Sequence, residues 1–383
     1  MQIIFTCDVA LNDKEAQNIH VIELYNNLAK VANVCLFVPK PKRIKVILSD
    51  VKYVPKLGIP ELGLLLYQIS LFFHLYFYCR KIKVDAIYSR QSPFTFIPFI
   101  VSNYFKIPHF VEVNGLITDE MKMFRQSKLR ITIAKLSEKL SYKRAIKIVA
   151  VTQGIKEGIM KLYNVPEKKI VVMGNGANID LFRPIDQEKA QKELKMDKNV
   201  SYVCFVGNIA PWQGIGYLIQ AAPLILLQCP NTHFLIVGDG SMKRECMQQA
   251  KELGIDDKFI FTGSVPYVKV SLYINASDIC VAPFVIKRNM KIGLSPLKVF
   301  EYLACEKPIV SSEILNLEFI EKENLGILVK PEDPEELAKA VIKLLKDDTL
   351  REEMGKNGRK YVVKNHSWEA IGRKTAEICS RNQ

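Results

Sequence analysis

The chain of 383 residues lacks the features that mark several large classes of protein. Its nine cysteines are scattered singly and form no C-x-x-C pair, which argues against a zinc site or a disulfide framework and for reduced, buried thiols. No G-x-G-x-x-G follows the first strand-like run, so a dinucleotide-dependent oxidoreductase is not expected. No Asp-x-Asp occurs in a metal-binding context, and we expect neither a metal ion nor a cofactor. The chain opens on a strand-like run without a basic leader, so we expect no signal peptide.

Acidic residues are scarce in the first part of the chain. Residues 1–150 hold 22 Lys and Arg against 11 Asp and Glu, whereas residues 151–383 hold 32 against 29. Most of the net charge of +14 therefore lies in the first half, which should face something anionic. Nucleic acid and a membrane surface are the two candidates.

The basic excess is densest between residues 121 and 147, where nine basic residues meet one acid, Glu138. Lysines recur every four residues on one face, and apolar residues mark another: Lys135, Lys139 and Lys143; Leu129, Ile133, Leu136 and Leu140. This pattern predicts a basic amphipathic helix that meets anionic lipid headgroups, or else a solvated face over a packed one. Aromatic residues do not interleave the basic ones, so we expect no nucleic-acid partner.

Long hydrophobic runs are also missing, with one borderline case at residues 62–79. Its 18 residues are short for a membrane span, and Gln68, Ser70 and His74 interrupt it. Its position before a strand-like run favours a buried crossover helix, with an interfacial helix and a span as alternatives. We therefore expect a protein of the cytoplasm, or one held peripherally on the inner face of the plasma membrane.

Strand-like and helix-like runs alternate along the whole chain, which is typical of parallel sheets built from βαβ units. The expected strands are 2–8, 34–38, 85–89, 108–113 and 146–151, then 202–206, 233–237, 259–262, 279–282, 309–311 and 326–329. The expected helices of the second half are 214–228, 241–253, 267–276, 296–305 and 334–346. We predict an α/β protein of two Rossmann-like, doubly wound domains facing a central cleft, with a turn-rich hinge at 175–184. The first domain is expected at 1–178, completed by a helix at 367–383, and the second at 179–366.

The most informative segment runs from Gly293 to Val310, where a turn of glycine, serine and proline enters a short helix. The backbone N–H groups of a helix start, together with the helix dipole, favour an anion, and Lys298 adds a full positive charge there. Glu301 follows one turn later on the same face and can accept hydrogen bonds from a diol. The pattern suits a nucleoside diphosphate lying across the helix start, and its alternative is an ordinary surface turn.

Glycine-rich motifs at the ends of neighbouring strand-like runs extend this candidate site. Parallel strands end at one edge of a sheet, which is where doubly wound sheets bind their ligands. The candidate donor-binding residues are Gly207, Asn208, Gln213, Gly214, Gly238, Val265, Ser295, Leu297, Lys298 and Glu301.

With these motifs the chain resembles the family-4 retaining glycosyltransferases, whose fold is called GT-B. The similarity covers nearly the whole length, including the turn at 175–178 and the run from Glu301 to Val310. That family carries two glutamates separated by seven residues, and the second binds the ribose of the donor. The second glutamate falls on Glu301, whereas the first falls on Gly293.

The resemblance also implies an Arg and a Lys that neutralise the leaving diphosphate, but these positions hold Asn208 and Gln213. We expect Lys298, with the backbone N–H groups of 295–298, to take over this stabilisation. The alternative is that the Lys298 side chain only extends into solvent.

The first half should bind the acceptor, through Asn18, Arg90, Glu112 and Asn114. The family often has a Gly-Gly pair in the loop after the first strand, here 8–18, and a catalytic-site His where this chain has Asn114. An asparagine can bind a sugar hydroxyl but cannot act as a base, which suits a retaining mechanism in which the leaving phosphate takes the proton. His20 is expected to be a packing residue at a helix start.

The resemblance therefore implies a glycosyltransferase that moves a sugar from a nucleotide-diphosphate sugar to a saccharide or lipid-linked acceptor. The expected catalytic residues are Lys298, Glu301 and Asn114. One alternative is an inactive, glycosyltransferase-like partner subunit that binds nucleotide sugar or glycan, because Gly293, Asn208 and Gln213 depart from the family. Another GT-B reaction, such as sugar-nucleotide epimerisation, would need acids and a His that the sequence does not place.

Overall fold

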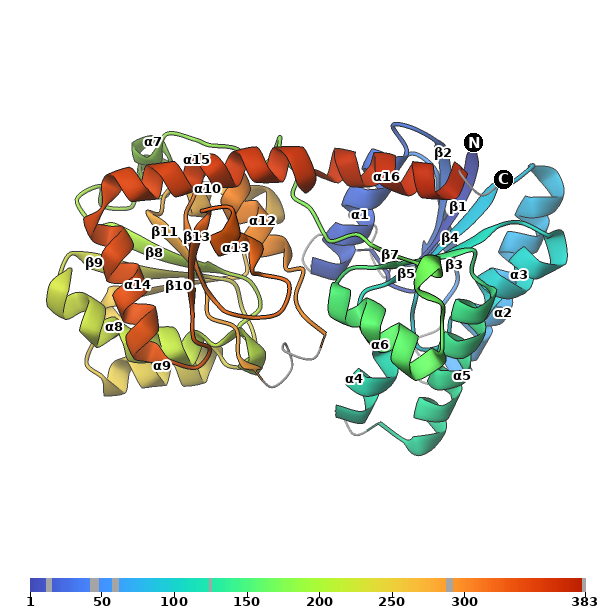
Figure 1. The fold of residues 1–383 in the computed structure, drawn as a ribbon, viewed down its shortest axis with the longest axis horizontal. Coiled ribbons are helices and arrows are strands. Elements are labelled where there is room, and N and C mark those ends of the chain that lie inside the picture. Colours follow the sequence, from blue (N-terminus) through green and yellow to red (C-terminus); the bar gives the residue numbers. More distant parts are fainter. Residues whose placement is uncertain (12–15, 42–47, 57–61, 124–125, 287–291, 381–383) are drawn as a thin grey trace. The chain divides into compact units, whose positions relative to one another are not determined.

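The computed structural model describes residues 1–11, 16–41, 48–56, 62–123, 126–286 and 292–380 (Figure 1). The chain forms two compact units. Met1–Gly174 and Trp368–Gln383 make up the first, and Asn175–Ser367 makes up the second. The turn at 175–178, which sequence analysis assigns to the first domain, belongs to the second unit.

The first unit is built on a seven-stranded sheet in the order β3-β2-β1-β4-β5-β6-β7. All its paired strands are parallel: β1 (Gln2–Thr6), β2 (Asn33–Pro39), β3 (Val51–Val54), β4 (Ala86–Arg90), β5 (His109–Val113), β6 (Lys147–Ala150) and β7 (Ile170–Val172). Five of these were expected from buried apolar runs. The outer strands β3 and β7 were not, because they are short and half-exposed and so lack that signal.

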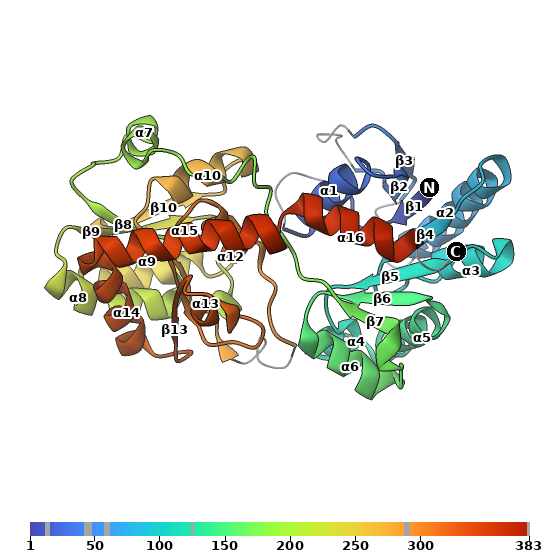
Figure 2. The same ribbon diagram turned by 45° about the horizontal axis from the view of Figure 1, so that its top comes forward.

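Helices cover both faces of this sheet: α1 (Ala16–Leu28), α2 (Leu62–Lys81), α3 (Ile97–Phe105), α4 (Ile117–Met123), α5 (Lys128–Arg144), α6 (Gln153–Tyr163) and α16 (Trp368–Ser380), with the 3-10 turn η1 (Glu167–Lys169). Right-handed crossovers in this strand order place α1 on one face and α2, α3, α5 and α6 on the other. Figures 1 and 2 show α1 beside α16 on the first of these faces.

Two expectations about these helices are met only in part. The helix at 62–79 is the expected crossover between β3 and β4, but it is buried on one side only, because α2 exposes one row of large apolar side chains. In α5, Leu129 and Leu136 are exposed beside the lysines, and the buried side holds Ala134, Ser137, Glu138, Ser141 and Tyr142. Glu138 can pack inward because it accepts hydrogen bonds from Thr118, Tyr142 and Tyr163, and the Ser141 hydroxyl donates one to the Thr95 carbonyl. Among the described residues, no helix combines the length and apolarity needed to cross a bilayer.

The second unit has a six-stranded parallel sheet in the order β10-β9-β8-β11-β12-β13. Its strands are β8 (Ser201–Val206), β9 (Thr232–Val237), β10 (Phe259–Gly263), β11 (Ile279–Ala282), β12 (Ile309–Ser312) and β13 (Gly326–Val329). Each lies within one residue of its expected bounds, because continuous apolar runs bounded by glycine, proline or polar residues are strong strand signals.

The helices of this unit are α7 (Gln187–Glu193), α8 (Ile215–Gln228), α9 (Lys243–Glu252), α10 (Tyr267–Asn275), α12 (Leu297–Ala304), α13 (Phe319–Lys322), α14 (Pro334–Lys346) and α15 (Asp348–Asn365). Two 3-10 turns, η2 (Pro211–Gln213) and η3 (Asp256–Lys258), precede α8 and β10. Local chemistry sets several ends: Asp333 caps α14 by accepting hydrogen bonds from the N–H groups of Glu335 and Glu336, and Pro334 occupies its first position.

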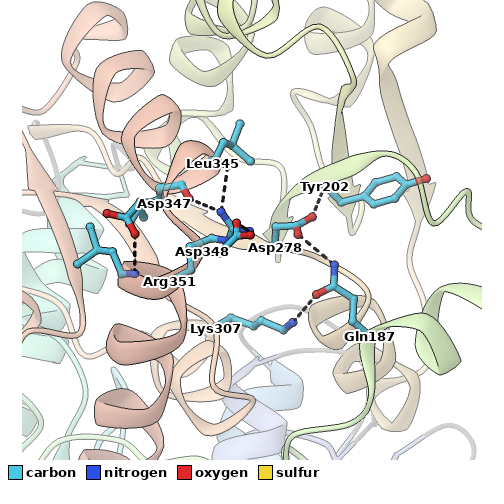
Figure 3. A network of polar contacts seen from close by, with 10 residues as sticks. Gln187, Tyr202, Asp278, Lys307, Leu345, Asp347, Asp348 and Arg351 are labelled. Atoms are coloured by element: carbon cyan, nitrogen blue, oxygen red, sulfur yellow. Dashed lines mark hydrogen bonds and ion pairs between the residues drawn. The ribbon is translucent and has the colours of Figure 1, made fainter.

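A polar network holds α7 to the amino-terminal edge of the second sheet (Figure 3). Asp278, just before β11, accepts hydrogen bonds from the Tyr202 N–H at 2.7 Å and the Gln187 side chain at 3.1 Å. Lys307, before β12, donates to the other end of the Gln187 amide at 3.3 Å. These groups stabilise the amino-terminal edge of the sheet. The glycine motifs and Lys298 belong to the opposite, carboxyl edge.

Each sheet has a point where the strand order reverses. In the first sheet it lies between β1 and β4, and in the second between β8 and β11. Loops that leave such neighbouring strands at the carboxyl edge diverge to opposite faces, and ligands bind there in doubly wound sheets. The prediction of two doubly wound α/β units is confirmed, and the strand order now says where in each sheet a ligand belongs.

Helix α16 packs closely on α1 within the first unit. A Cβ built at Gly372 would fall 2.7 Å from the backbone carbon of Asn27, so the two helix backbones approach more closely than any side chain allows. Trp368, 2% exposed, fills the same interface, where its ring meets the His20 ring edge-on at 5.1 Å. This glycine therefore fixes how the last helix seats on the first unit.

We expect Gly372→Ala to lower the stability of the first unit by about 1–3 kcal/mol, because overpacking outweighs the gain of roughly 1 kcal/mol in helix propensity. Gly216→Ala in α8 is the matched control, since its Cβ would meet only the flexible side chain of Gln249 at 3.3 Å. Thermal unfolding of both variants measures the difference. Equal melting temperatures for the two would contradict the close packing of α16 on α1.

Candidate functional site

The carboxyl edge of β8 and its neighbours gathers the glycine motifs into one surface. A Cβ on Gly238, after β9, would fall 1.9 Å from the Gly207 carbonyl oxygen, so the two strand ends touch through their backbones. Gly214 has φ +71° at the start of α8, and a Cβ there would lie 1.7 Å from the Pro283 carbonyl oxygen after β11. Only glycine fits at positions 214 and 238. Both lie at the carboxyl edge of the sheet, near the reversal of strand order between β8 and β11.

Lys298 projects from the first turn of α12 onto this glycine surface. Its Nζ donates a hydrogen bond to Gln213 Oε1 at 2.7 Å and lies 3.8 Å from the centre of the Phe205 ring. A Cβ at Gly207 would fall 2.8 Å from the same Nζ. The alternative that Lys298 only extends into solvent is therefore wrong. The ammonium lies between positions 207 and 213 and contacts Gln213, one of the two residues that the family resemblance expects to be basic.

Burial lowers the pKa of Lys298 to about 7, and the carboxylate of Glu301 opposes that shift. The Phe205 ring face offsets part of the lost hydration through a cation–π contact. An ammonium held in such surroundings binds an anion more strongly than one in water, because little solvent screens the pair. The arrangement is suited to a diphosphate.

Glu301 lies one turn beyond Lys298 in α12 and is 5% exposed. Its Oε1 accepts a hydrogen bond of 3.0 Å from the Tyr267 hydroxyl at the start of α10. This contact orients the carboxylate, and Tyr267 is thereby a positioning residue that sequence analysis missed. The signal was weak, since Tyr267 only follows the Val265-Pro266 turn that was already a candidate.

The next residue, Tyr302, anchors the helix to the sheet. The N–H of Val206, the last residue of β8, donates a hydrogen bond to the Tyr302 hydroxyl at 2.7 Å. The start of α12 is therefore held in register with the end of β8. The same hydrogen bond also fixes the positions of Lys298 and Glu301, which lie on this helix.

Gly293 has φ +69°, and a Cβ there would fall 2.8 Å from the Leu315 carbonyl oxygen and 3.1 Å from the Asn316 side chain. An L-residue at this position would be strained as well as crowded. The loop that carries a glutamate in the resembling family thus has a backbone conformation here that disfavours one.

The remaining candidates of this half lie around the same edge. The Ser295 hydroxyl accepts a hydrogen bond from the Asn175 N–H at 2.7 Å, and the Ser295 carbonyl accepts one from the Asn175 side chain at 2.5 Å. Leu297 is the first residue of α12, and Val265 lies in the turn between β10 and α10. The Asn208 side chain lies against Gly240, where a Cβ would meet its Oδ1 at 2.4 Å.

In the first unit, Glu112 at the end of β5 is the centre of a buried network. Its Oε1 accepts a hydrogen bond from Asn114 Nδ2 at 2.5 Å and lies 2.8 Å from His20 Nε2, and its Oε2 accepts one from the Tyr88 hydroxyl at 2.8 Å. Burial alone would raise the pKa of Glu112, but His20, Arg90 and Asn114 hold it at about 2. The carboxylate is 2% exposed and committed to these groups, so it positions Asn114 and His20.

His20 is therefore more than the packing residue that was expected, because it joins Glu112 and Asn114 in one network. Arg90 ends β4, and its Cα pairs with that of Glu112 across the sheet. Asn18 lies in α1 with its side chain 0% exposed and neither amide atom hydrogen-bonded. The loop at 8–18 falls partly outside the described residues, at 12–15.

One polar contact at this edge was not anticipated. Asp8, two residues after β1, accepts a hydrogen bond from the hydroxyl of Ser92, two residues after β4. The Ser92 and Thr95 hydroxyls lie 2.6 Å apart, and burial raises the pKa of Asp8. Since β1 and β4 flank the strand-order reversal, these groups stand where a ligand of the first unit is expected. Sequence analysis missed the pair because strand order decides which loops meet.

In the part of the chain that the structure describes, no three His, Cys, Asp or Glu side chains are grouped so that they could hold a metal ion.

We expect Glu112→Gln to lower the melting temperature by about 4–10 °C at pH 7, because an amide leaves donors of the network unpaired at a cost of about 2–3 kcal/mol. The folded-state pKa lies below the ordinary value of 4.5, so the carboxylate stabilises the fold fully above pH 4.5 and loses this effect as the pH falls toward 2. The difference between variant and wild type should therefore shrink at pH 3.5. Glu167→Gln, in an exposed ion pair with Lys156, is the control and should change little. A pH-independent difference would contradict the ionised network.

Comparison with known proteins shows the family to which the chain belongs. Residues 186–378, just over half the chain, match the family described as Glycosyl transferases group 1, and residues 17–181 match Glycosyltransferase Family 4. An uncharacterized glycosyltransferase, MJ1069 of Methanocaldococcus jannaschii, is 26% identical over 94% of both chains. The capsular polysaccharide biosynthesis glycosyltransferase CapM of Staphylococcus aureus is 25% identical over 76% of this chain and 77% of its own.

A solved structure shares the fold. Anabaena Alr3699/HepE in complex with UDP-glucose superimposes with a TM-score of 0.78 over 100% of both chains, at 19% identity. The two doubly wound sheets are thus those of the GT-B fold, and the resemblance expected from the sequence is confirmed. The chain belongs to the glycosyl transferases group 1 family and is a glycosyltransferase of the family-4 type.

Proposed function

We propose that this protein is a retaining, metal-independent glycosyltransferase that moves a sugar from a nucleotide-diphosphate sugar to a saccharide or lipid-linked acceptor in cell-surface polysaccharide or glycoconjugate synthesis. The observation that carries the proposal is the position of Lys298 Nζ, 2.7 Å from Gln213 and against the Gly207 turn. This ammonium stands where the charge of a leaving diphosphate needs stabilisation. The name of CapM supports the polysaccharide context, and the UDP-glucose complex of HepE supports the class of donor.

The reaction follows from these groups. The bond between the anomeric carbon and the diphosphate oxygen breaks, and the acceptor oxygen bonds to the same face of that carbon. The acceptor proton passes to the leaving phosphate, because Asn114, the candidate acceptor contact, cannot take it. Lys298 and the N–H groups at the start of α12 stabilise the developing diphosphate charge, so no divalent cation is required. Glu301, oriented by Tyr267, holds the ribose hydroxyls.

The acceptor site of this proposal lies at the carboxyl edge of the first sheet. Asn114 and Arg90 offer hydrogen bonds to sugar hydroxyls or to an acidic group, Glu112 positions Asn114, and Asn18 contributes a buried amide. The enzyme would work at the cytoplasmic face of the plasma membrane, with the basic segment 121–147 against anionic headgroups. Free cysteines at all nine positions suit a reducing compartment.

A second candidate is a partner subunit that binds nucleotide sugar or glycan without turnover. The conformation of Gly293 favours it, since a glutamate there would be strained and crowded. Sugar donors incubated with a membrane extract separate the two candidates. Transferred sugar together with released nucleotide supports the enzyme, release without transfer indicates hydrolysis, and the absence of both products supports the partner subunit.

We expect Lys298→Ala to lower kcat roughly 100- to 1,000-fold with the fold intact, because one charge-stabilising donor is lost. The double variant Gln213→Lys/Lys298→Gln places the ammonium on residue 213, where the family has its lysine. Because Lys298 Nζ lies 2.7 Å from Gln213 Oε1, this exchange moves the charge little and should recover part of the turnover. The assays contain EDTA, which removes divalent cations. Their substrate is the sugar donor that supports transfer in the membrane-extract experiment.

The pH profile supplies a second measure. Because Lys298 is protonated below its pKa of about 7, wild-type kcat/KM should fall as pH rises through that value, and Lys298→Ala should lack this limb. Near-normal turnover of Lys298→Ala, or an unchanged limb, would rule out the assigned role of Lys298.

A further inference from the structure

Helix α2 exposes a row of large apolar side chains that no described element covers. Leu65, Ile69, Phe73 and Phe77 are 58%, 46%, 51% and 57% exposed. Their spacing of four residues places them along one side of the helix. The opposite side, with Tyr67, Leu71 and Leu75, is fully buried against the sheet. The helix is therefore apolar on both sides, although only one of them belongs to the core.

The row continues onto the neighbouring helix α3. Ile100 and Tyr104 are exposed there, and the Tyr104 ring lies 5.8 Å from that of Tyr76 in α2. We call the set Leu65, Ile69, Phe73, Phe77, Ile100 and Tyr104 the aromatic surface. Contiguous exposed apolar side chains of this kind on a soluble unit mark an interaction site.

Basic residues gather at one end of the aromatic surface. Arg80 and Lys81 lie in the last turn of α2, Lys83 follows that helix and Lys106 follows α3, and all four are exposed. Between residues 62 and 111 the sequence contains one acid, Asp85, whose carboxylate accepts the Gln2 N–H at 2.7 Å. Helix α5, on the same face of the sheet, adds exposed Lys135, Lys139 and Lys143 beside Leu129 and Leu136.

These charges decide between the partners that an apolar surface could have. A second copy of the chain would offer few acidic side chains to pair with Arg80, Lys81, Lys83 and Lys106, because the same surface of that copy is equally basic. An anionic bilayer offers an apolar layer for the aromatic row and phosphates for the basic rim. Tyr76 and Tyr104, with apolar rings and polar tips, suit the boundary between those layers.

We propose that the aromatic surface of α2 and α3 inserts into the headgroup region of an anionic lipid bilayer. Insertion differs from adsorption of the basic segment 121–147 alone, because apolar contact survives salt that screens charge. The inference does not rest on the transferase reaction, and its test needs no sugar donor.

Flotation of the full chain with vesicles of phosphatidylcholine and phosphatidylglycerol tests the proposal. We expect the wild type to float at low salt, and Phe73→Ser/Phe77→Ser and Lys81→Glu/Lys83→Glu each to weaken binding about tenfold or more. The matched controls are Leu227→Ser/Val268→Ser and Lys339→Glu/Lys360→Glu, which change exposed side chains of the second unit and should float like the wild type. Circular dichroism confirms that each variant is folded.

A second measurement distinguishes insertion from adsorption. Phe77→Trp should add tryptophan fluorescence that brominated lipid quenches, whereas Leu227→Trp in α8 should add fluorescence that it does not quench. A wild type that stays with the pellet, serine variants that float normally, or an unquenched Phe77→Trp would each overturn the proposal. Light scattering that shows a dimer broken by Phe73→Ser/Phe77→Ser would overturn it in favour of self-association.

Discussion

The donor half of this protein depends on one ammonium group held in a poorly hydrated place. Lys298 lies between the Phe205 ring and the Gln213 side chain, where burial lowers its pKa to about 7 while a hydrogen bond, a ring face and a nearby carboxylate each favour the charged form. The glycine at 207 is required for the same reason, since any side chain there would displace the Nζ. The start of α12 is held in place by the contact of Tyr302 with β8.

In the proposed function, a cation carried by α12 stands in for one carried by the loop after β8, because the Lys298 ammonium lies against Gly207 and Gln213. At position 293 a glutamate side chain would be strained and crowded in the present backbone conformation.

The first unit shows a different balance. Its buried carboxylate, Glu112, is satisfied by neighbours on β4, β5 and α1, so it stabilises the site and presents Asn114. Its outer helices are less completely buried. Helix α2 exposes a second apolar side, and basic residues lie in its last turn. A sequence alone could not separate these cases, because Phe73 and Leu71 look equally suited to a core.

The sequence by itself determined the α/β class and the central strands of both sheets, because apolar runs and glycine turns are local signals, and it predicted candidate sites at the carboxyl ends of those strands. It also singled out Lys298 and Glu301, whose spacing on one helix face follows from helical geometry. Tertiary structure decided what depends on strand order and packing direction. The meeting of Asp8 with Ser92, the link of His20 to Glu112 and the contact of Lys298 with Gln213 join residues far apart in the chain. No local pattern records which loops leave adjacent strands or which side of an apolar helix turns toward solvent. The position of the α12 helix start at the β8–β11 reversal is known only from the fold.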